Sequence, residues 1–411
     1  MTQRRARGDG SLHQRADGLW IGRVELPRGP DGKRRSKTVS SRSFDTAATQ
    51  LRKLRSDVDE GRIAVTGSTT LEKWLERWLT EIHADKIRPT TQRDYRAAIT
   101  NHINPAIGSK RLDKLTPQHI RLMHAHVGKR RAAEKAHVIL KKALKDAVRE
   151  GMITRNVAEM VDPPRYKHHR RTSLSVDIAK HIISTAYASR DESEATRWAA
   201  AFLTGARQSE LLGLRWSYVD LEAGYMDISW QLQQLSQIHG CGRTCGRTRP
   251  GWCPQRQWDL PPDFEYEECH RSLVFTRPKT GAGERIVPIV APLLLKLREL
   301  HTMQGANPHD LVWHQPDGRP IGPREDYGAW KALLVAAGVI NDKETLSMHT
   351  ARHTTATLLR SAGVDEQTRM EILGHATADS QRIYAHADRS RHLSAMGPLA
   401  ELLSIEPLVQ R

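Results

Sequence analysis

The sequence of 411 residues contains 64 lysines and arginines against 47 aspartates and glutamates, a formal net charge of +17 at pH 7. This balance points to an acidic polymer such as nucleic acid as partner, and the 38% hydrophobic content predicts folded domains. No stretch reaches the roughly 18 apolar residues of a membrane span, and the N-terminal residues are charged, so we expect a cytoplasmic protein and disfavour export.

Residues 1–62 form the first predicted module, which is basic: 15 lysines and arginines against 8 acidic residues give a net charge of +7. Two extended runs, 19–26 and 37–41, flank a Gly-Pro-Asp-Gly turn, and a helical pattern follows at 46–58. We predict a three-stranded sheet packed on one helix. Its basic face could contact a DNA groove; the alternative is a charged face that is only solvated.

A compact all-helical domain is predicted over 69–160. Apolar residues recur there at steps of three and four: Leu71, Trp74, Leu75, Trp78 and Leu79. That stripe indicates a helix with a core-facing side, and further helical segments are expected at 90–103, 116–127 and 132–150. The segment 161–171 combines a proline pair with a basic run, so we predict a tether and a domain boundary there.

From Ser173 onward the pattern mixes helices and strands. Arg207 follows a glycine and precedes a new helix, a position that favours an anion site. The runs 272–276 and 285–290 are predicted to pair as strands, joined by a glycine-rich turn that carries Lys279. A lysine there could donate a proton to a leaving oxygen, or be an ordinary solvated turn residue.

The C-terminal third holds the remaining candidate residues. A helix beginning at His349 would place His349, Arg352 and His353 on one face. A second helix is predicted to be capped by Asp365 and to end at Gly374, directly before His375. Tyr384 follows on a short predicted helix.

These motifs, in this order and spacing, resemble those of the tyrosine recombinases, specifically the phage-type integrases. The matching positions are Thr204-Gly-Ala-Arg207, Glu210 to Trp216, Pro278-Lys-Thr280, His349-x-x-Arg-His353, Leu373-Gly-His375 and Tyr384. One departure is Ala351, where leucine is common in the family, and it bears on local packing more than on chemistry.

The resemblance implies a multidomain α+β protein. Its parts would be an arm-type DNA-binding module (1–62), a helical core-binding, SAM-like domain (69–160), a mixed α/β catalytic domain (173–390) and a C-terminal tail (391–411). It also implies double-stranded DNA attachment sites, a homotetramer, and host or phage DNA-bending and directionality factors as partners. Residues 392–409 of the tail could dock on a neighbouring subunit or pack on their own domain.

The resemblance implies a role for each candidate residue and no cofactor in the chemistry. Tyr384 would attack the phosphorus and form a 3′-phosphotyrosyl link, while Arg207 and Arg352 bind the nonbridging oxygens. Lys279 would protonate the leaving 5′ oxygen, with His349 moving the tyrosine proton and His375 donating to a phosphoryl oxygen. His353 is interpreted as a supporting neighbour.

The segment 239–270 is longer than the usual link between these strands in the family and contains all four cysteines. Cys241, Cys245, Cys253 and Cys269 have the spacing C-x₃-C-x₇-C-x₁₅-C. Four thiols could close a structural zinc site, but the last two lack compact spacing, and the alternative is a loop with reduced thiols.

Other functions stay open at this point. Within the enzymes, a Xer-like resolving recombinase, a type IB topoisomerase or a conjugative-transposon transposase would use similar chemistry. The extra basic N-terminal module favours integration and excision of a phage or mobile element. Outside the enzymes, the chain could be a non-catalytic DNA-binding regulator.

Overall fold

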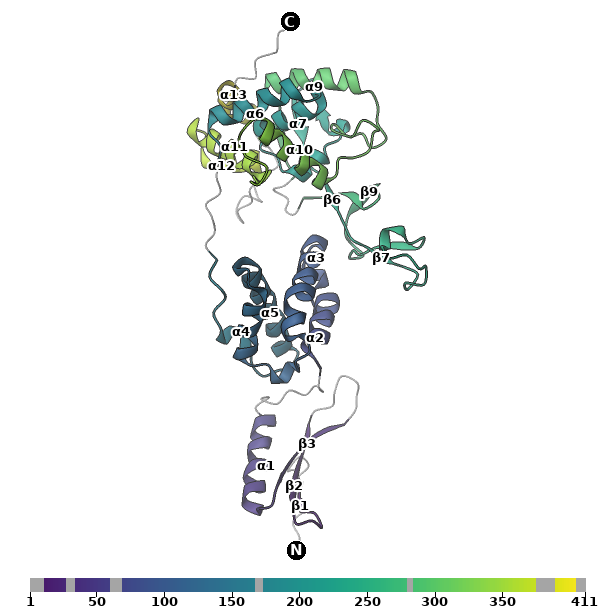
Figure 1. Cartoon of the computed structure of the whole chain (residues 1–411), viewed down its shortest axis with the longest axis vertical. Helices are drawn as coiled ribbons and strands as arrows, with labels where there is room; N and C mark the ends of the chain where they lie inside the picture. The colour runs from purple at the N-terminus through teal and green to yellow at the C-terminus, as the bar shows by residue number, and fades with distance from the viewer. Residues whose placement is uncertain are drawn as a thin grey trace. The chain divides into compact units, whose positions relative to one another are not determined.

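The chain divides into two compact units, Met1–His168 and His169–Arg411 (Figure 1). Their division falls inside the segment 161–171 for which a tether is predicted. The computed structural model describes residues 11–26, 34–59, 69–166, 173–278, 284–374 and 389–403. Among these residues, no helix combines the length and the apolar character needed to cross a membrane.

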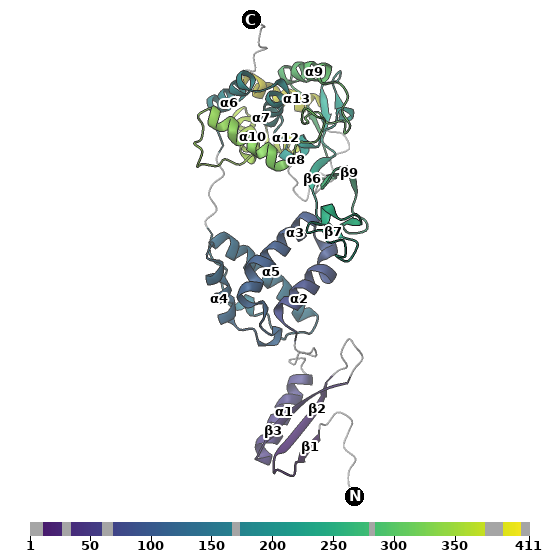
Figure 2. The ribbon, with the colours of Figure 1, turned by 45° about the vertical axis from the view of Figure 1, so that its right-hand side comes forward.

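The first part of the N-terminal unit is an antiparallel three-stranded sheet with one helix, as the sequence predicts (Figure 2). Its elements are β1 (Ser11–Gln14), β2 (Trp20–Leu26), β3 (Arg35–Ser41) and α1 (Phe44–Asp59). The helix lies so close to the sheet that a Cβ on Gly22 would come within 2.9 Å of Leu51 Cδ1. Val24 and Ala47 are buried at this contact.

The second part of this unit consists of helices around one apolar core. They are α2 (Leu71–Arg77), η1 (Trp78–Ile82), η2 (Ala84–Lys86), α3 (Pro89–Ala98), η3 (Ile99–Gly108), η4 (Leu112–Lys114), α4 (Pro117–Val127), α5 (Arg130–Arg149) and η5 (Val157–Met160). The indole of Trp74 donates to the carbonyl of Ala143 at 3.1 Å, and that of Trp78 to Asp146 at 2.8 Å. The predicted apolar stripe is therefore core, and it is fixed to α5.

Helices enclose the main core of the C-terminal unit. They are α6 (Val176–Ser189), α7 (Glu192–Thr204), α8 (Gln208–Leu212), η6 (Trp216–Tyr218), α9 (Ala291–Gln304), α10 (Pro323–Ala336), α11 (His349–Ser361), α12 (Glu366–Leu373) and α13 (Arg389–Leu403). Trp198, Phe202 and Trp330 meet at its centre. Ala351 is buried in this core, so alanine fits where leucine is common in the family.

Two three-stranded sheets and one two-stranded ribbon complete the C-terminal unit. Their strands are β4 (Val219–Asp220), β5 (Tyr225–Asp227), β6 (Gln231–Gln234), β7 (Gln237–His239), β8 (Arg256–Trp258), β9 (Tyr266–His270), β10 (Leu273–Thr276) and β11 (Ile286–Pro288). The predicted pairing of 272–276 with 285–290 is wrong. Because β6 and β9 occupy both edges of β10, β11 pairs with β5 in the other sheet.

The C-terminal helix α13 packs on its own unit. Met396, Leu399 and Leu403 are buried in the main core, and His392 Nε2 lies 2.9 Å from an oxygen of Glu371 on α12. Of the two possibilities left open for this segment, the described part shows packing in cis. Residues 404–411 lie outside the described residues.

Candidate active site

Arg207 is positioned by a helix end and a helix start, as predicted. Helix α7 ends at Gly205, which has φ of +61°, and Arg207 is the N-cap residue of α8. A Cβ at Gly205 would lie 2.6 Å from Leu373 Cδ2, so both the backbone conformation and the close approach of α12 require glycine. Arg207 is therefore held at the point where α7, α8 and α12 meet.

Arg352 enters the same place from α11. Its guanidinium donates to the carbonyl of Gly205 at 2.8 Å and to the carbonyl of Leu373. Its residue is 4% exposed, whereas the side chain of Arg207 is 33% exposed. One arginine thus lies beneath the site and the other lines its accessible side.

A third arginine, Arg285, completes the arrangement. Three arginines donate to three consecutive carbonyls at the end of α12: Arg285 to Ile372 at 2.8 Å, Arg352 to Leu373, and Arg207 to Gly374 at 3.1 Å. The last carbonyls of a helix have no partner inside the helix and carry its partial negative charge, which favours cations at this end. The structure therefore joins the two predicted phosphate ligands through the C-terminus of α12.

Glu210 balances this positive charge from inside the unit. It is 1% exposed, and its carboxylate accepts from Arg207 Nη1 at 2.5 Å and from Arg285 Nη2 at 2.9 Å. Burial alone would raise the pKa of Glu210, but the charges and hydrogen bonds of Arg285 and Arg207 outweigh it and lower the pKa to about 2. The carboxylate is charged at neutral pH, so three arginines and one glutamate leave a net charge of +2.

The environment of Arg352 is strongly cationic. Burial lowers the pKa of its guanidinium to about 9, and repulsion by Arg207 and Arg285 acts in the same direction, against the attraction of Glu210. An anion bound here would relieve that repulsion. The charge of the cluster is therefore compatible with the anion site that the sequence predicts at Arg207.

His349 and His353 lie one turn apart at the start of α11, as predicted, with ring centroids 6.3 Å apart. His349 is exposed and His353 is half-buried. Arg352, between them in the sequence, reaches into the cluster. The spacing of the three residues puts both histidines on the same side of α11 as Arg352.

Three predicted residues lie outside the described residues: Lys279, His375 and Tyr384. Their roles stay predictions. Gly374, the residue directly before His375, belongs to the cluster through its bond to Arg207.

Two residues of the site received no role from the sequence. Glu210 was visible only as part of a motif, and Arg285 precedes an apolar strand after a glycine-rich turn, a place where a solvated arginine is the usual interpretation. Both are almost completely buried, at 1% and 6% exposure. A buried pair of this kind becomes recognisable only when the fold brings 210 and 285 together.

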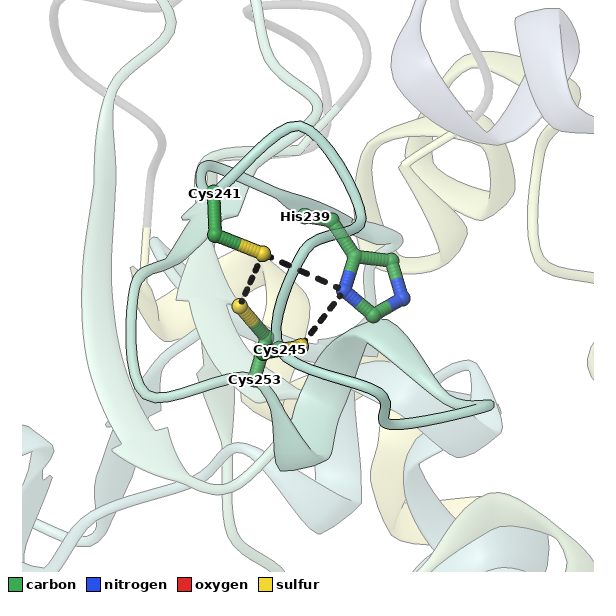
Figure 3. Close-up of side chains that lie close together, drawn as sticks. All are labelled: His239, Cys241, Cys245 and Cys253. Atoms are coloured by element: carbon green, nitrogen blue, oxygen red, sulfur yellow. Dashed lines mark hydrogen bonds between the residues drawn. The ribbon is translucent and has the colours of Figure 1, made fainter.

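A second cluster of reactive side chains lies away from these arginines, on the ribbon of β7 and β8. His239, Cys241, Cys245 and Cys253 place one ligand atom each within 4.8 Å of the others (Figure 3). The predicted set was therefore wrong at one position. Cys269, on β9, packs instead against a separate small core, where burial raises the pKa of its thiol to about 12.

Comparison with known proteins identifies the family of the chain. Residues 70–124 match the phage integrase N-terminal SAM-like domain, and residues 267–391 match the phage integrase family. An integrase of Saccharopolyspora erythraea is 30% identical over 424 residues, covering 94% of this chain and 95% of the relative. The chain therefore belongs to the phage integrase family of tyrosine recombinases.

Solved structures show the same fold at low sequence identity. The Tn1549 transposon integrase in complex with transposon right end DNA has a TM-score of 0.59 at 16% identity, covering 81% of this chain and all of that one. A lambda integrase tetramer bound to a Holliday junction has a TM-score of 0.53 at 17% identity, covering 91% and 97%. The multidomain α+β class is confirmed, and the chain is a site-specific recombinase of the integrase type.

Proposed function

We propose that the chain cuts and rejoins DNA through a 3′-phosphotyrosyl intermediate in which Tyr384 is the nucleophile. The observation that carries this proposal is the meeting of Arg207 and Arg352 at the carbonyls of Gly374 and Leu373. A phosphodiester carries one negative charge, and its five-coordinate transition state carries two. The +2 cluster matches the transition state better than the ground state, which is the condition for catalysis.

Each bond change in this scheme has a donor or an acceptor. The Tyr384 oxygen forms a bond to phosphorus while the bond to the 5′ oxygen breaks, and Lys279 gives that oxygen a proton. His349 takes the tyrosine proton. In the second half, a 5′ hydroxyl of the other strand attacks the phosphotyrosine and gives its proton to Lys279, while the bond from phosphorus to Tyr384 breaks and His349 returns a proton to the tyrosine. No ATP is consumed, and no step is assigned to a metal ion.

His375 is proposed to donate to a phosphoryl oxygen. It directly follows Gly374, the residue whose carbonyl accepts from Arg207. This connection along the chain is the support for the proposed role of His375.

The biological reaction we propose is integration and excision of a phage or mobile element. Residues 1–62 would bind arm-type DNA sites and the helical residues 69–160 the core site, with four copies assembled on two duplexes and accessory DNA-bending and directionality factors. The higher identity to an integrase, 30% against 23% for a XerC-like recombinase that also matches over the full length, supports this over a Xer-like resolvase. The working location would be the nucleoid.

A nicked duplex that traps the covalent intermediate tests the chemistry. Wild-type protein should yield a protein–DNA adduct that survives denaturation, and Tyr384→Phe should yield none while still binding the duplex. Tyr327→Phe is the matched control, because Tyr327 is an exposed tyrosine of α10 in the same unit. Adducts that persist in Tyr384→Phe, or that vanish in Tyr327→Phe, would refute the assignment.

A further inference from the structure

The ribbon of β7 and β8 gathers four ligand atoms in the geometry of a metal site. Cys253 Sγ lies 3.4 Å from Cys241 Sγ, and His239 Nδ1 lies 3.4 Å from Cys245 Sγ and 4.0 Å from Cys241 Sγ (Figure 3). Zinc bonds of about 2.3 Å to sulfur and 2.0 Å to nitrogen give tetrahedron edges of about 3.5 to 3.8 Å. These three separations bracket the edges, and all four atoms lie within 4.8 Å of one another.

The backbone is shaped to turn these side chains inward. Gly242 and Gly246, each directly after a cysteine, have φ of +62° and +67°, and neither has a neighbour within 4 Å of a Cβ position. Conformation rather than crowding therefore requires glycine at both places. The Pro250–Trp252 turn (η7) then brings Cys253 in from the other side, with its N–H bonded to the Pro250 carbonyl at 2.9 Å.

The ribbon has almost no apolar core that could hold it together. Ile238 is 44% exposed and Trp252 is 62% exposed, whereas Cys253 is 1% exposed. An isolated two-stranded ribbon is only marginally stable in water, and small modules without a core commonly depend on a metal or on disulfides. The buried centre of this ribbon consists of sulfur and imidazole instead of hydrocarbon.

We propose that His239 Nδ1 and the thiolates of Cys241, Cys245 and Cys253 bind one Zn²⁺ ion in a closed, structural site. Four protein ligands complete a tetrahedron and leave no position for substrate, which separates this role from catalysis. Each thiol releases one proton when it binds the ion. The ion would fix the ribbon that projects from the β6-β10-β9 sheet.

Metal content of the full-length protein tests the proposal. Purified under reducing conditions and loaded with Zn²⁺, wild-type protein should hold about one equivalent after removal of free metal. Cys241→Ser and Cys253→Ser should each retain less than about half an equivalent. Cys269→Ser is the matched control: its thiol lies in the same insert but outside the cluster, so it should retain the metal.

A second readout covers variants that lose the ribbon altogether. With Co²⁺ in place of Zn²⁺, wild-type protein and Cys269→Ser should both show the visible absorption of a tetrahedral thiolate site. When a chelator removes the metal, a protease should cut the wild-type chain between residues 240 and 256 faster than it cuts the metal-loaded protein. A wild-type protein with less than about half an equivalent overturns the site. Loss of metal in Cys269→Ser overturns this ligand set. A Cys241–Cys253 disulfide that persists under reducing conditions overturns both the metal site and the ligand set.

The charge on the surface of the same ribbon is an independent observation, and it indicates what that surface binds. Residues 237–258 contain four arginines and no acidic residue, and all four are exposed: Arg243, Arg247, Arg249 and Arg256. Among the described residues none of the four forms an ion pair, whereas Arg215 and Arg277 of the adjoining sheet pair with Glu267 and Glu265. Arg249 also lies 5.0 Å from the ring centroid of exposed Trp252.

We infer that this surface contacts the phosphate backbone of DNA, an inference that rests on the proposed function. Removing one phosphate contact should reduce the slope of log binding constant against log salt by about 0.9. Arg247→Gln is the test variant on a long duplex of mixed sequence. Arg298→Gln, on α9 at the other end of the unit (Figures 1 and 2), removes the same charge and should leave the slope unchanged.

The two failures are distinguishable. If wild-type protein binds DNA and forms the Tyr384 adduct but Arg247→Gln keeps the wild-type slope, the surface inference is wrong and the recombinase chemistry stands. If wild-type protein forms no adduct, the proposed function fails whatever the slope does. An equal loss of slope in Arg298→Gln shows a general charge effect and also overturns the surface inference.

Discussion

Arg207 and Arg352 donate to the carbonyls of two consecutive residues, Gly374 and Leu373, although 145 positions separate the two arginines in the chain (352 − 207). The end of α12 therefore acts as a common anchor for both guanidiniums. Each guanidinium has five N–H donors, and each uses at least one here to fix its plane. Preorganisation of this kind removes reorganisation from the reaction step.

Replacing Arg352 with lysine should abolish most activity without abolishing DNA binding. A lysine cannot bind both the Gly205 and Leu373 carbonyls as a rigid fork, and the burial and cationic neighbours that lower the pKa of Arg352 would also favour uncharged lysine. We expect a loss of about 3–4 kcal/mol in transition-state stabilisation, or a several-hundred-fold slower covalent trapping. Arg360→Lys, exposed at the end of the same helix, should react normally.

Glu210 should make the C-terminal unit sensitive to acid. Its folded-state pKa is about 2 against an ordinary 4.5, so the unfolded chain takes up the proton first as the pH falls. The contribution, on the order of 3 kcal/mol, is complete above pH 4.5 and is lost between 4.5 and 2. Urea unfolding of Glu210→Gln across this range should show a flatter pH dependence; an unchanged slope would contradict the assignment.

Arg285 is predicted to position the site without touching DNA. At 6% exposure it connects Glu210 to the end of α12, so Arg285→Met leaves a buried carboxylate with one partner fewer. Breaking such a buried pair typically costs about 3–5 kcal/mol of stability. The pairwise part is measured by a double-mutant cycle with Glu210→Gln, and a coupling energy near zero would rule out the proposed link.

The sequence predicts local structure here better than it predicts partners. The helix caps lie where the sequence predicts them: Asp365 begins α12, and Gly205 and Gly374 end α7 and α12. Caps can be predicted because they depend on residues close in the sequence. The β10–β11 pairing was predicted wrongly because the sequence of a short apolar strand does not specify which other strand it pairs with. His239 replaced Cys269 in the cluster for a similar reason, although a histidine two residues before Cys241 was a signal that could have been used.

A histidine pair should make the N-terminal unit sensitive to milder acid. His124 Nε2 and His137 Nδ1 lie 3.0 Å apart, and burial, with the charges of His124 and Lys141, lowers the pKa of His137 to about 4. Because the unfolded pKa is 6.5, the stability due to neutral His137 is present above pH 6.5 and is lost as the pH falls toward 4. In calorimetry, His137→Gln should flatten the dependence of the melting temperature on pH between 6.5 and 4. The same substitution at exposed His126 should leave that dependence unchanged.

Truncation at two positions separates the core role of α13 from any role of the residues beyond it. Deleting everything after Asp388 removes Met396, Leu399 and Leu403, all buried in the main core. Removing even one such side chain costs about 2–5 kcal/mol, so this deletion should unfold or strongly destabilise the C-terminal unit and prevent covalent trapping.

Deleting only 404–411 keeps these contacts and should leave the melting temperature and trapping unchanged. If the residues beyond Leu403 dock on a neighbouring subunit, the shorter deletion should still reduce assembly of two duplexes in a gel-shift assay. A chain cut after Asp388 that melts like wild type would show that α13 adds nothing to its own unit, contrary to the packing observed.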